Sequence, residues 1–518
     1  MNPNSSPLGR RDLIKGAVAA GATALVHRDW EALAATGAEA PRAAPMLVRD
    51  ENARPGANDW QLSRVRLDHL GGFRSPWIEG YCSRQSIEAG QQLDIMVSVD
   101  PPVPYTLEIF RMGYYGGSGA RLMHALGPLD GRTQPVPEVG PRRLRECRWE
   151  PDITLTIPDD WPSGAYLGRL VRVAAADGTN PWQNYVVFIV RDRRPADILF
   201  QCSDNTWQAY NRWPDTYSLY DNGTAGWVSG PGVDVSFDRP YGKYRQIYEN
   251  PQSVGSGEFL CWEYPLCYWL EQQGYDVTYC SNSDLLTADE AARGRVLISV
   301  GHDEYWDLRQ HDAVKGAVER GTTVLFLSGN TLCWVSPLSA STTGEPLRIM
   351  TREAPYRGMT MSDIPLNSAF TSVGPDEGLL LGARNIQPVN GGGDWIVTRP
   401  DHWMFAGTGM KKGDAIPGLV GWEFHGNPGE LPGLEVVAEG FALHSGSKPC
   451  PWAATIYPGP KGNFVFNAST IFWAQGLSSP PGHMLPWSHW TRPHGPDVRV
   501  RQITRNLLDR ALGGSAAS

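Results

Sequence analysis

Two different spacings of apolar residues divide the chain into two parts. Over residues 59–193 apolar and polar positions alternate, as at Leu93, Ile95, Val97 and Val99, and glycine and proline separate the runs. A period of two is typical of half-buried β-strands, because successive side chains of a strand point to opposite faces of the sheet. The pattern predicts an immunoglobulin-like β-sandwich over this part.

The second part, residues 194–513, alternates between short apolar runs and amphipathic segments. Strands are predicted at residues 196–202, 275–279, 296–300 and 322–327, and helices at 263–274 and 307–321. Strands joined by helices at this spacing form parallel β-α-β units. The predicted fold class is therefore α/β, with a parallel-core domain of the Rossmann or glutamine-amidotransferase type behind the N-terminal sandwich. The glycine- and proline-rich residues 336–475 are predicted to add β-rich insertions.

The beginning of the chain shows neither pattern. Arg10 and Arg11 precede a short, weakly apolar stretch at residues 16–26, which resembles a twin-arginine (Tat) export signal. We expect the signal to occupy residues 1–34 and a linker to occupy residues 35–58. The apolar stretch is too short for a membrane anchor. The sequence thus predicts export to the periplasm or the cell exterior.

Charge and cysteine spacing limit the kinds of partner. The net charge is −9 and no long basic stripe is present, so nucleic-acid binding is not expected, because phosphate contacts need clustered lysine and arginine. No apolar run reaches the length of about 20 residues that spans a bilayer. The eight cysteines include no CxxC pair, which favours neither a zinc knuckle nor a dense disulfide framework. Most are expected to be buried thiols, with room for one or two disulfides.

The 20 tryptophans leave two interpretations open. Either they build large aromatic cores, or some of them line a surface that binds glycans. The second interpretation defines an alternative function for the chain, an exported glycan- or surface-binding module with a non-catalytic α/β domain. That alternative requires a flat, exposed aromatic stripe that includes residues such as Trp161, Trp182 and Trp422.

Polar residues follow four of the predicted parallel strands at the point where each strand ends. The segments are 203–210, 281–284, 301–305 and 328–330. Because the carboxyl ends of parallel strands lie at one edge of a sheet, where ligands bind, the four segments are expected to form one site. The run VLISVGHDEYW, residues 296–306, would place His302, Asp303 and Glu304 at that edge.

Local capping is the competing explanation for the same residues. Asp307 fits a helix N-cap, Asp303 or Glu304 would favour the positive end of that helix, and Asn330 fits a turn. No serine or cysteine nucleophile stands on the sharp strand-to-helix turn, which disfavours a triad hydrolase. His302 and Glu304, with nearby tyrosines, favour a hard metal ion over a zinc bound by thiolates.

Several longer motifs resemble one known family, the large (β) subunit of N,N-dimethylformamidase. The motifs are NTWQAYN (205–211), FDRPY (237–241), GHDEYW (301–306), GNTLCW (329–334) and FNASTIFWAQGL (466–477). Shorter matches extend the resemblance to nearly everything after about residue 60. The resemblance implies that linear non-peptide amides are hydrolysed at a mononuclear iron, Fe³⁺, held by two tyrosines and one glutamate.

Motif by motif, the resemblance also implies the metal ligands. Tyr210 in NTWQAYN and Glu304 in GHDEYW would be two of them. The second tyrosine best matches Tyr241 in FDRPY, with Tyr244 and Tyr248 as the other candidates.

The resemblance assigns further roles around the metal. His302 would lie beside a metal-bound water and move protons, and Asn330 would orient the substrate. A lysine that the family carries farther along has no clear match, and Arg352 is the candidate in its place, so the resemblance does not imply dimethylformamide itself. The family enzyme works with a small subunit. We therefore expect a small amide substrate, and a partner subunit or a homo-oligomer.

Overall fold

The computed structural model of the protein describes the chain in several stretches. These are residues 48–67, 72–173, 181–223, 232–243, 250–361, 371–387, 391–444, 448–485 and 494–513. The predicted export signal lies outside them, so export stays a prediction. The predicted linker is described only from α1 (Val48–Asn52) onward.

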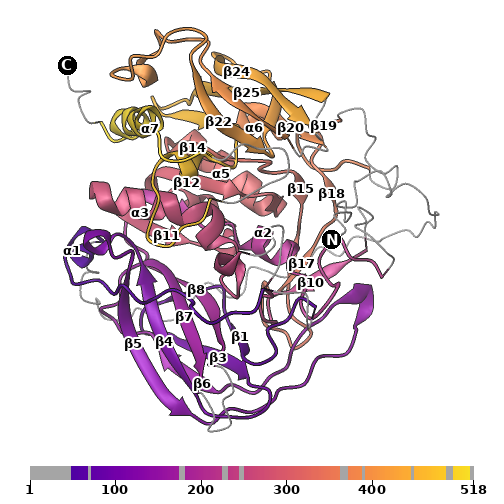
Figure 1. The fold of residues 1–518 in the computed structure, drawn as a ribbon. Coiled ribbons are helices and arrows are strands. Elements are labelled where there is room, and N and C mark those ends of the chain that lie inside the picture. Colours follow the sequence, from indigo (N-terminus) through magenta and orange to yellow (C-terminus); the bar gives the residue numbers. More distant parts are fainter. Residues whose placement is uncertain are drawn as a thin grey trace, which may run out of the picture.

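Two β-sheets with one shared core make up the N-terminal part, drawn in indigo and purple in Figure 1. The first sheet pairs β1 (Glu79–Cys82), β3 (Gln92–Ser98) and β6 (Ile153–Thr156). The second has the order β2 (Ser86–Glu88), β8 (Gln183–Arg191), β7 (Gly164–Arg172), β4 (Tyr105–Met112) and β5 (Ala120–Leu129). Leu93, Ile95 and Val97 are buried, as their alternation predicts, and they share a core with Leu107 and Ile109 of the second sheet.

A nine-stranded mixed sheet forms the rest of the framework. Its first five strands are parallel and follow in the order β11 (Val277–Cys280), β9 (Ala196–Gln201), β12 (Gly294–His302), β14 (Thr323–Gly329) and β26 (Phe464–Asn467). Antiparallel pairing then extends the sheet through β25 (Lys448–Pro458), β24 (Glu435–His444), β21 (Gly391–Ile396) and β22 (Ala415–Trp422). Figure 1 shows this antiparallel end in orange, on the far side of the parallel strands from the N-terminal sheets.

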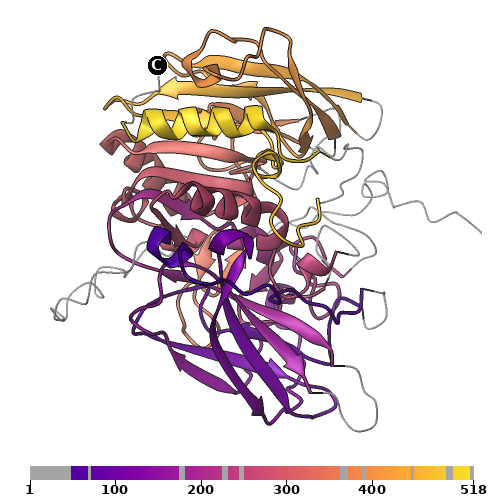
Figure 2. The same ribbon diagram turned by 60° about the vertical axis from the view of Figure 1, so that its left-hand side comes forward.

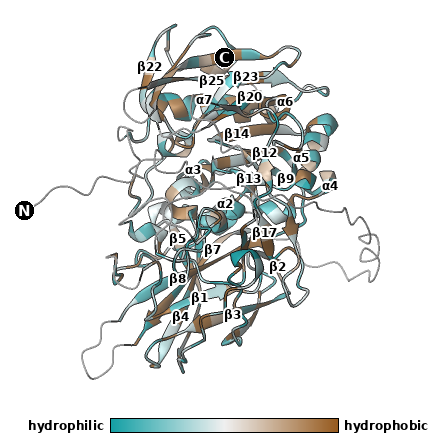
Figure 3. Cartoon of the chain, turned by 90° about the vertical axis from the view of Figure 1, so that its right-hand side faces the viewer, coloured by the Kyte–Doolittle hydropathy of each residue, from teal (hydrophilic) through white to brown (hydrophobic). Residues whose placement is uncertain are grey.

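Helices cover both faces of the parallel strands. On one face α5 (Leu308–Arg320) packs Val314 and Ala317 against Leu297 and Phe326. On the other face α3 (Tyr264–Gln273) and α7 (Val498–Ala511) share a core with alternate residues of β12 and β14, and Figure 2 shows α7 lying along the sheet. Strands buried on both faces read as continuous apolar runs, which Figure 3 shows along the centre of the molecule.

The predicted fold class is wrong. Among the described residues strands make up 35% and helices 19%, and the main sheet is mixed, so the second part is not a helix-dominated, Rossmann- or glutamine-amidotransferase-like α/β domain. The local elements were predicted correctly, because β9, β11, β12, β14, α3 and α5 all form at the expected residues. The error arises from residues 391–467, whose strands join the same sheet through pairings that no local pattern encodes.

Short strands surround the carboxyl edge of the parallel strands. They form three small sheets from β10 (Asp234–Ser236), β17 (Ile349–Thr351) and β16 (Leu338–Ser339), from β13 (Tyr305–Trp306), β15 (Trp334–Val335) and β18 (Ala354–Pro355), and from β19 (Thr360–Met361), β20 (Ala383–Gln387) and β23 (His425–Pro428). The second of these sheets pairs Tyr305 with Trp334 and so ties the segment after β12 to the segment after β14.

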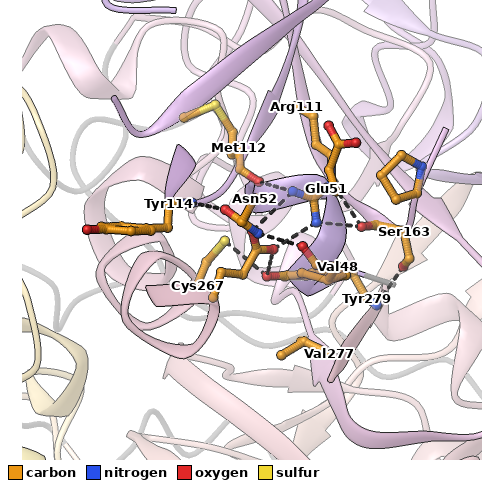
Figure 4. Close-up of polar contacts among 12 residues, drawn as sticks. Val48, Glu51, Asn52, Arg111, Met112, Tyr114, Ser163, Cys267, Val277 and Tyr279 are labelled. Carbon is orange, nitrogen blue, oxygen red and sulfur yellow. Dashed lines mark hydrogen bonds and ion pairs between the residues drawn. The ribbon is translucent and has the colours of Figure 1, made fainter. Parts of the chain in front are cut away.

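A buried ion pair joins β4 of the N-terminal sheets to helix α3, and Figure 4 shows its arginine, Arg111, close to Asn52 and Tyr279. Arg111 of β4 and Glu271 of α3 are fully buried, and Nη2 of the arginine lies 2.8 Å from Oε1 of the glutamate. Tyr279 donates to the same carboxylate at 2.7 Å, and Asn52 of α1 donates to it at 2.6 Å. Each donor comes from a different element, so the carboxylate fixes how α1, β4, α3 and β11 pack together.

The structure also bears on two further predictions, which concern the state of the cysteines and the presence of a membrane-spanning helix. All eight cysteines are buried and carry free thiols. Within the described ranges, no helix combines the length and the apolar character needed to cross a membrane.

Candidate metal centre

The predicted site residues gather at the carboxyl edge of the parallel strands. His302 is the last residue of β12 and pairs with Gly329 at the end of β14, so Asn330 follows on the neighbouring strand. Tyr210 caps the C-terminus of α2 (Asp204–Ala209), the helix that follows β9. Tyr210, Glu304, His302 and Asn330 are all buried. The structure therefore brings these four side chains to one edge of the sheet, and their roles stay predictions.

Glycine at position 301 allows the chain to turn at the end of β12. Gly301 has a φ of 69°, and a Cβ atom there would lie 2.6 Å from the Cβ of Trp262. After the turn, side chains alternate. Asp303 points to a separate network and accepts hydrogen bonds from Gln201, Asn282 and Ser299 at 2.5, 2.9 and 2.8 Å. These three hydrogen bonds occupy the Asp303 carboxylate. Asp307 caps the N-terminus of α5, as the capping explanation predicts.

Phenol and carboxylate oxygens converge at Glu304. The Tyr210 hydroxyl donates to Oε2 of Glu304 at 2.5 Å, and the Tyr220 hydroxyl donates to Oε1 at 3.4 Å. The two phenol oxygens are 3.2 Å apart, and Tyr305 extends the cluster with its hydroxyl 2.5 Å from that of Tyr220. Trp334 donates its indole N–H to Oε1 of Glu304 at 2.9 Å, which fixes the carboxylate plane. We call Tyr210, Tyr220, Tyr305 and Glu304 the oxygen cluster.

A histidine and a second glutamate border the oxygen cluster. His302 Nε2 lies 2.7 Å from Oε2 of Glu423 and 3.2 Å from Oε2 of Glu304. Asn330 donates its amide N–H to the same Glu423 oxygen at 2.9 Å. One ligand atom from each of His302, Glu304 and Glu423 lies within 4.8 Å of the others, close enough for one ion. These three buried residues form a group that could hold a metal.

Burial and mutual charge set the protonation of the site. Burial raises the pKa of Tyr210 well above its ordinary value, and the nearby Glu304 carboxylate raises it further. Burial alone lowers the pKa of His302, but the charges of Glu423 and Glu304 outweigh burial and raise that pKa well above its ordinary value. Such a group of buried acids is costly unless cations neutralise it. Oxygen donors of this kind match the preference of a hard metal ion, so the donor set fits iron in the ferric state.

Arg352 provides positive charge next to the oxygen cluster. Its guanidinium lies 4.4 Å from the ring centroid of Tyr220 and 4.8 Å from that of Trp334, the two residues that contact Oε1 of Glu304. Stacking of a buried guanidinium on two aromatic faces is favourable through the ring quadrupoles. Arg352 therefore holds both rings against the carboxylate that they orient.

Comparison with known proteins identifies the family of the chain. The sequence model described as N,N-dimethylformamidase beta subunit-like, C-terminal, matches residues 106–486, which is well over half of the chain. The chain belongs to this family. The β subunit of N,N-dimethylformamidase from Paracoccus aminophilus is 26% identical over 233 residues, and the match covers 37% of this chain and 28% of that protein. The chain thus corresponds to less than a third of its curated relative.

The structure places the tyrosines of the family motifs in different surroundings. Tyr210 lies in the oxygen cluster. Tyr241 packs edge-to-face on Trp207, with ring centroids 6.4 Å apart, and lines a different cavity, so its role as a ligand stays a prediction. Tyr244 and Tyr248 lie outside the described residues. The phenol beside Tyr210 belongs instead to Tyr220.

Sequence reasoning missed two residues of the site, Tyr220 and Glu423. Tyr220 lies in an irregular segment, and nothing in its surroundings marks it. Glu423 had a usable signal, because it directly follows the apolar strand β22, just as Asp303 and Glu304 follow β12. Because Glu423 lies in the glycine-rich region, the sequence pattern did not indicate that β22 belongs to the same sheet as β12.

Two of the three tryptophans that the glycan-binding alternative requires on an exposed stripe are buried, and the third, Trp182, is half-buried. Trp161 and Trp422 are only 6% and 4% exposed. Trp422 packs on Trp262 and His302 beside the metal centre, with ring centroids 5.5 and 6.1 Å away. These tryptophans belong to aromatic cores rather than to a flat binding face.

Proposed function

We propose that the chain is a hydrolase of linear non-peptide C–N bonds that depends on a mononuclear iron, Fe³⁺. The observation that supports this most strongly is the 2.5 Å contact between the Tyr210 phenol and the Glu304 carboxylate in a buried cluster of oxygen donors. The family agrees with it, because the Paracoccus relative is a dimethylformamidase subunit. Tyr210, Tyr220 and Glu304 would hold the ion. A bound ferric ion supplies Lewis acidity that polarises an amide carbonyl and acidifies water.

The other polar residues of the site would move the protons. His302 carries a proton at Nε2 between Glu423 and Glu304, so it can deliver that proton to the nitrogen that leaves the amide. Glu423 accepts hydrogen bonds and can take the proton that water loses. Because Trp422 covers the imidazole, bulk water is kept from this exchange.

Asn330 would select amides that carry an N–H group. Its Nδ2 is engaged by Glu423, whereas its buried Oδ1 has no hydrogen-bond partner in the part of the chain that the structure describes. An amide N–H would satisfy this oxygen, and a tertiary amide would leave it unpaired. An unsatisfied buried acceptor costs about 1–3 kcal/mol, which corresponds to about 5- to 150-fold in rate.

We therefore expect kcat/KM for N-methylformamide to exceed that for N,N-dimethylformamide by at least about tenfold. Asn330 has a φ of 55°, so Asn330→Gly removes the side chain without backbone strain. In that variant the ratio should fall towards one. Steady-state assays of the iron-loaded protein measure both ratios. Failure to hydrolyse any linear amide would argue against the proposed function itself.

The identity of the second phenolate ligand can be read from colour. Phenolate bound to Fe³⁺ absorbs visible light, so Tyr220→Phe should remove a large share of that absorbance and of the bound metal. Tyr241→Phe is the matched control, because the ring of Tyr241 lies on Trp207. If Tyr241→Phe removes the colour and Tyr220→Phe does not, the ligand set must be reassigned to the pair Tyr210 and Tyr241.

Export through the Tat route and a partner subunit are also part of the proposal. The twin arginines support the first, and the second rests on the relative being named a β subunit. Replacing Arg10 and Arg11 with lysines should leave the precursor in the cytoplasm, which cell fractionation and immunoblotting would detect. Normal delivery of that double variant would contradict a Tat signal.

A further inference from the structure

A cavity outside the metal centre lies between the N-terminal sheets and helix α2. Its walls include Gly80 to Cys82 of β1 and Val186 and Val187 of β8 on one side, and Asp204 and Trp207 on the other. Its volume is about 20 Å³, which is room for about one or two water-sized groups. None of the oxygen cluster lines it, so this cavity is separate from the metal centre.

Asp204 lines this cavity, and one of its carboxyl oxygens is unsatisfied. The side chain is 1% exposed, and its Oδ1 accepts a hydrogen bond from the Asn282 backbone N–H at 2.7 Å. Its Oδ2 is buried and has no hydrogen-bond partner among the described residues. Burial raises the pKa of this carboxyl to about 8, so near neutral pH Oδ2 carries a proton to donate. Because buried donors are normally hydrogen-bonded, a ligand with a hydrogen-bond acceptor would satisfy this group.

Arginine side chains make the rest of the lining positive. Arg84 is exposed at the cavity and has no ion-pair partner within the described ranges. Arg348 also lines the cavity and pairs with Asp238 at 2.7 Å, and Arg239 donates to Gln208 and to backbone carbonyls. Three arginines and one carboxyl residue thus line the cavity, and a small anion is the ligand that this balance favours.

We propose that this cavity binds a small monocarboxylate of about the size of formate, between Asp204 and Arg84. One carboxylate oxygen would accept from the Asp204 carboxyl, and the other would accept from the Arg84 guanidinium. A monocarboxylate is also what hydrolysis of a linear amide releases, so the site suits a product. The proposal does not depend on the proposed function, because binding is measured without turnover.

The affinity should depend on pH through Asp204. Above about pH 8 the carboxyl ionises and repels the ligand, so the dissociation constant should rise about tenfold per pH unit. Other titratable and charged groups also act on Asp204 or line the cavity with it, and they are Cys202, Glu263, Cys280, Asp284, Asp303 and the three arginines. Burial raises the pKa of both thiols well above the ordinary value, so they add no negative charge near pH 8.

Isothermal titration of the full chain with sodium formate tests the proposal. Given the small size of the ligand, we expect one site per chain with a dissociation constant of about 1 mM at pH 6.5. In iron-loaded protein the phenolate-to-iron absorbance should not change on titration, which separates this site from the metal centre.

Two variants make the test specific. Arg84→Gln should weaken formate binding at least about tenfold, and Arg357→Gln, at an exposed position, is its matched control. Asp204→Asn keeps the acceptor for Asn282 and places an N–H₂ donor at the position of Oδ2. It should therefore retain binding at pH 6.5 and lose the weakening above pH 8, whereas Asp160→Asn, also exposed, should behave like the unmodified chain.

Three outcomes would overturn the proposal. The first is no binding of formate up to about 20 times the expected dissociation constant. The second is binding that Arg84→Gln leaves unchanged, and the third is a pH dependence that Asp204→Asn does not alter. A protein that binds formate as described but hydrolyses no amide would refute the proposed function and leave this site in place.

Discussion

Glu304→Gln is expected to lower the iron content to below about one tenth of that of the unmodified protein. The substitution keeps the size of the side chain but removes the charge towards which Tyr210, Tyr220 and Trp334 all point. Loss of a residue that merely orients a ligand already costs about 10- to 100-fold in metal affinity, and loss of a ligand costs more. Amide hydrolysis should fall to background with the metal.

Metal analysis per chain and the phenolate-to-iron absorbance measure this effect. Asp303→Asn is the matched control, because Asp303 is an equally buried neighbour whose carboxylate serves Gln201, Asn282 and Ser299 instead. It should retain most of the metal even where the thermal stability falls. If Glu304→Gln keeps one coloured iron per chain, or if Asp303→Asn loses as much metal, Glu304 is not a ligand.

The part of the site that could be predicted from the sequence is the part that local pattern encodes. An apolar run that ends in polar residues marks a strand end, and parallel strands place such ends side by side. That reasoning located His302, Glu304, Tyr210 and Asn330 at one edge. Three family motifs that contain site residues lie at these strand ends, so the resemblance and the pattern indicated the same residues.

The part that could not be predicted depends on pairing between distant segments. Glu423 reaches the site only because β22, β21, β24 and β25 extend the parallel strands, and each of those pairings joins segments whose own sequences fit many partners. The same pairings turn the expected α/β core into a mixed sheet. Register in such a sheet is set by contacts across strands, and a single sequence does not display them.

The largest effect on stability is expected for Arg111→Met. Arg111 and Glu271 are both fully buried, and the guanidinium donates to the carboxylate at 2.8 and 3.1 Å and to the Ser163 carbonyl. Burial lowers the pKa of Arg111, but the Glu271 charge outweighs burial and raises that pKa, so the guanidinium stays charged. Removing the arginine leaves Glu271 as an uncompensated buried charge, which costs about 3–5 kcal/mol.

The double variant Arg111→Met with Glu271→Leu separates the two sources of that cost. Because neither charge then remains buried, it should be more stable than Arg111→Met alone, although Tyr279 and Asn52 lose their acceptor. Denaturant unfolding followed by tryptophan fluorescence measures the free energy of unfolding of the unmodified protein, of the two single variants and of the double variant. A loss of less than about 1 kcal/mol for Arg111→Met would mean that the carboxylate is neutralised by protonation or water when its partner is removed. The ion pair would then help to align the N-terminal sheets with the main sheet but would contribute little to the free energy of unfolding.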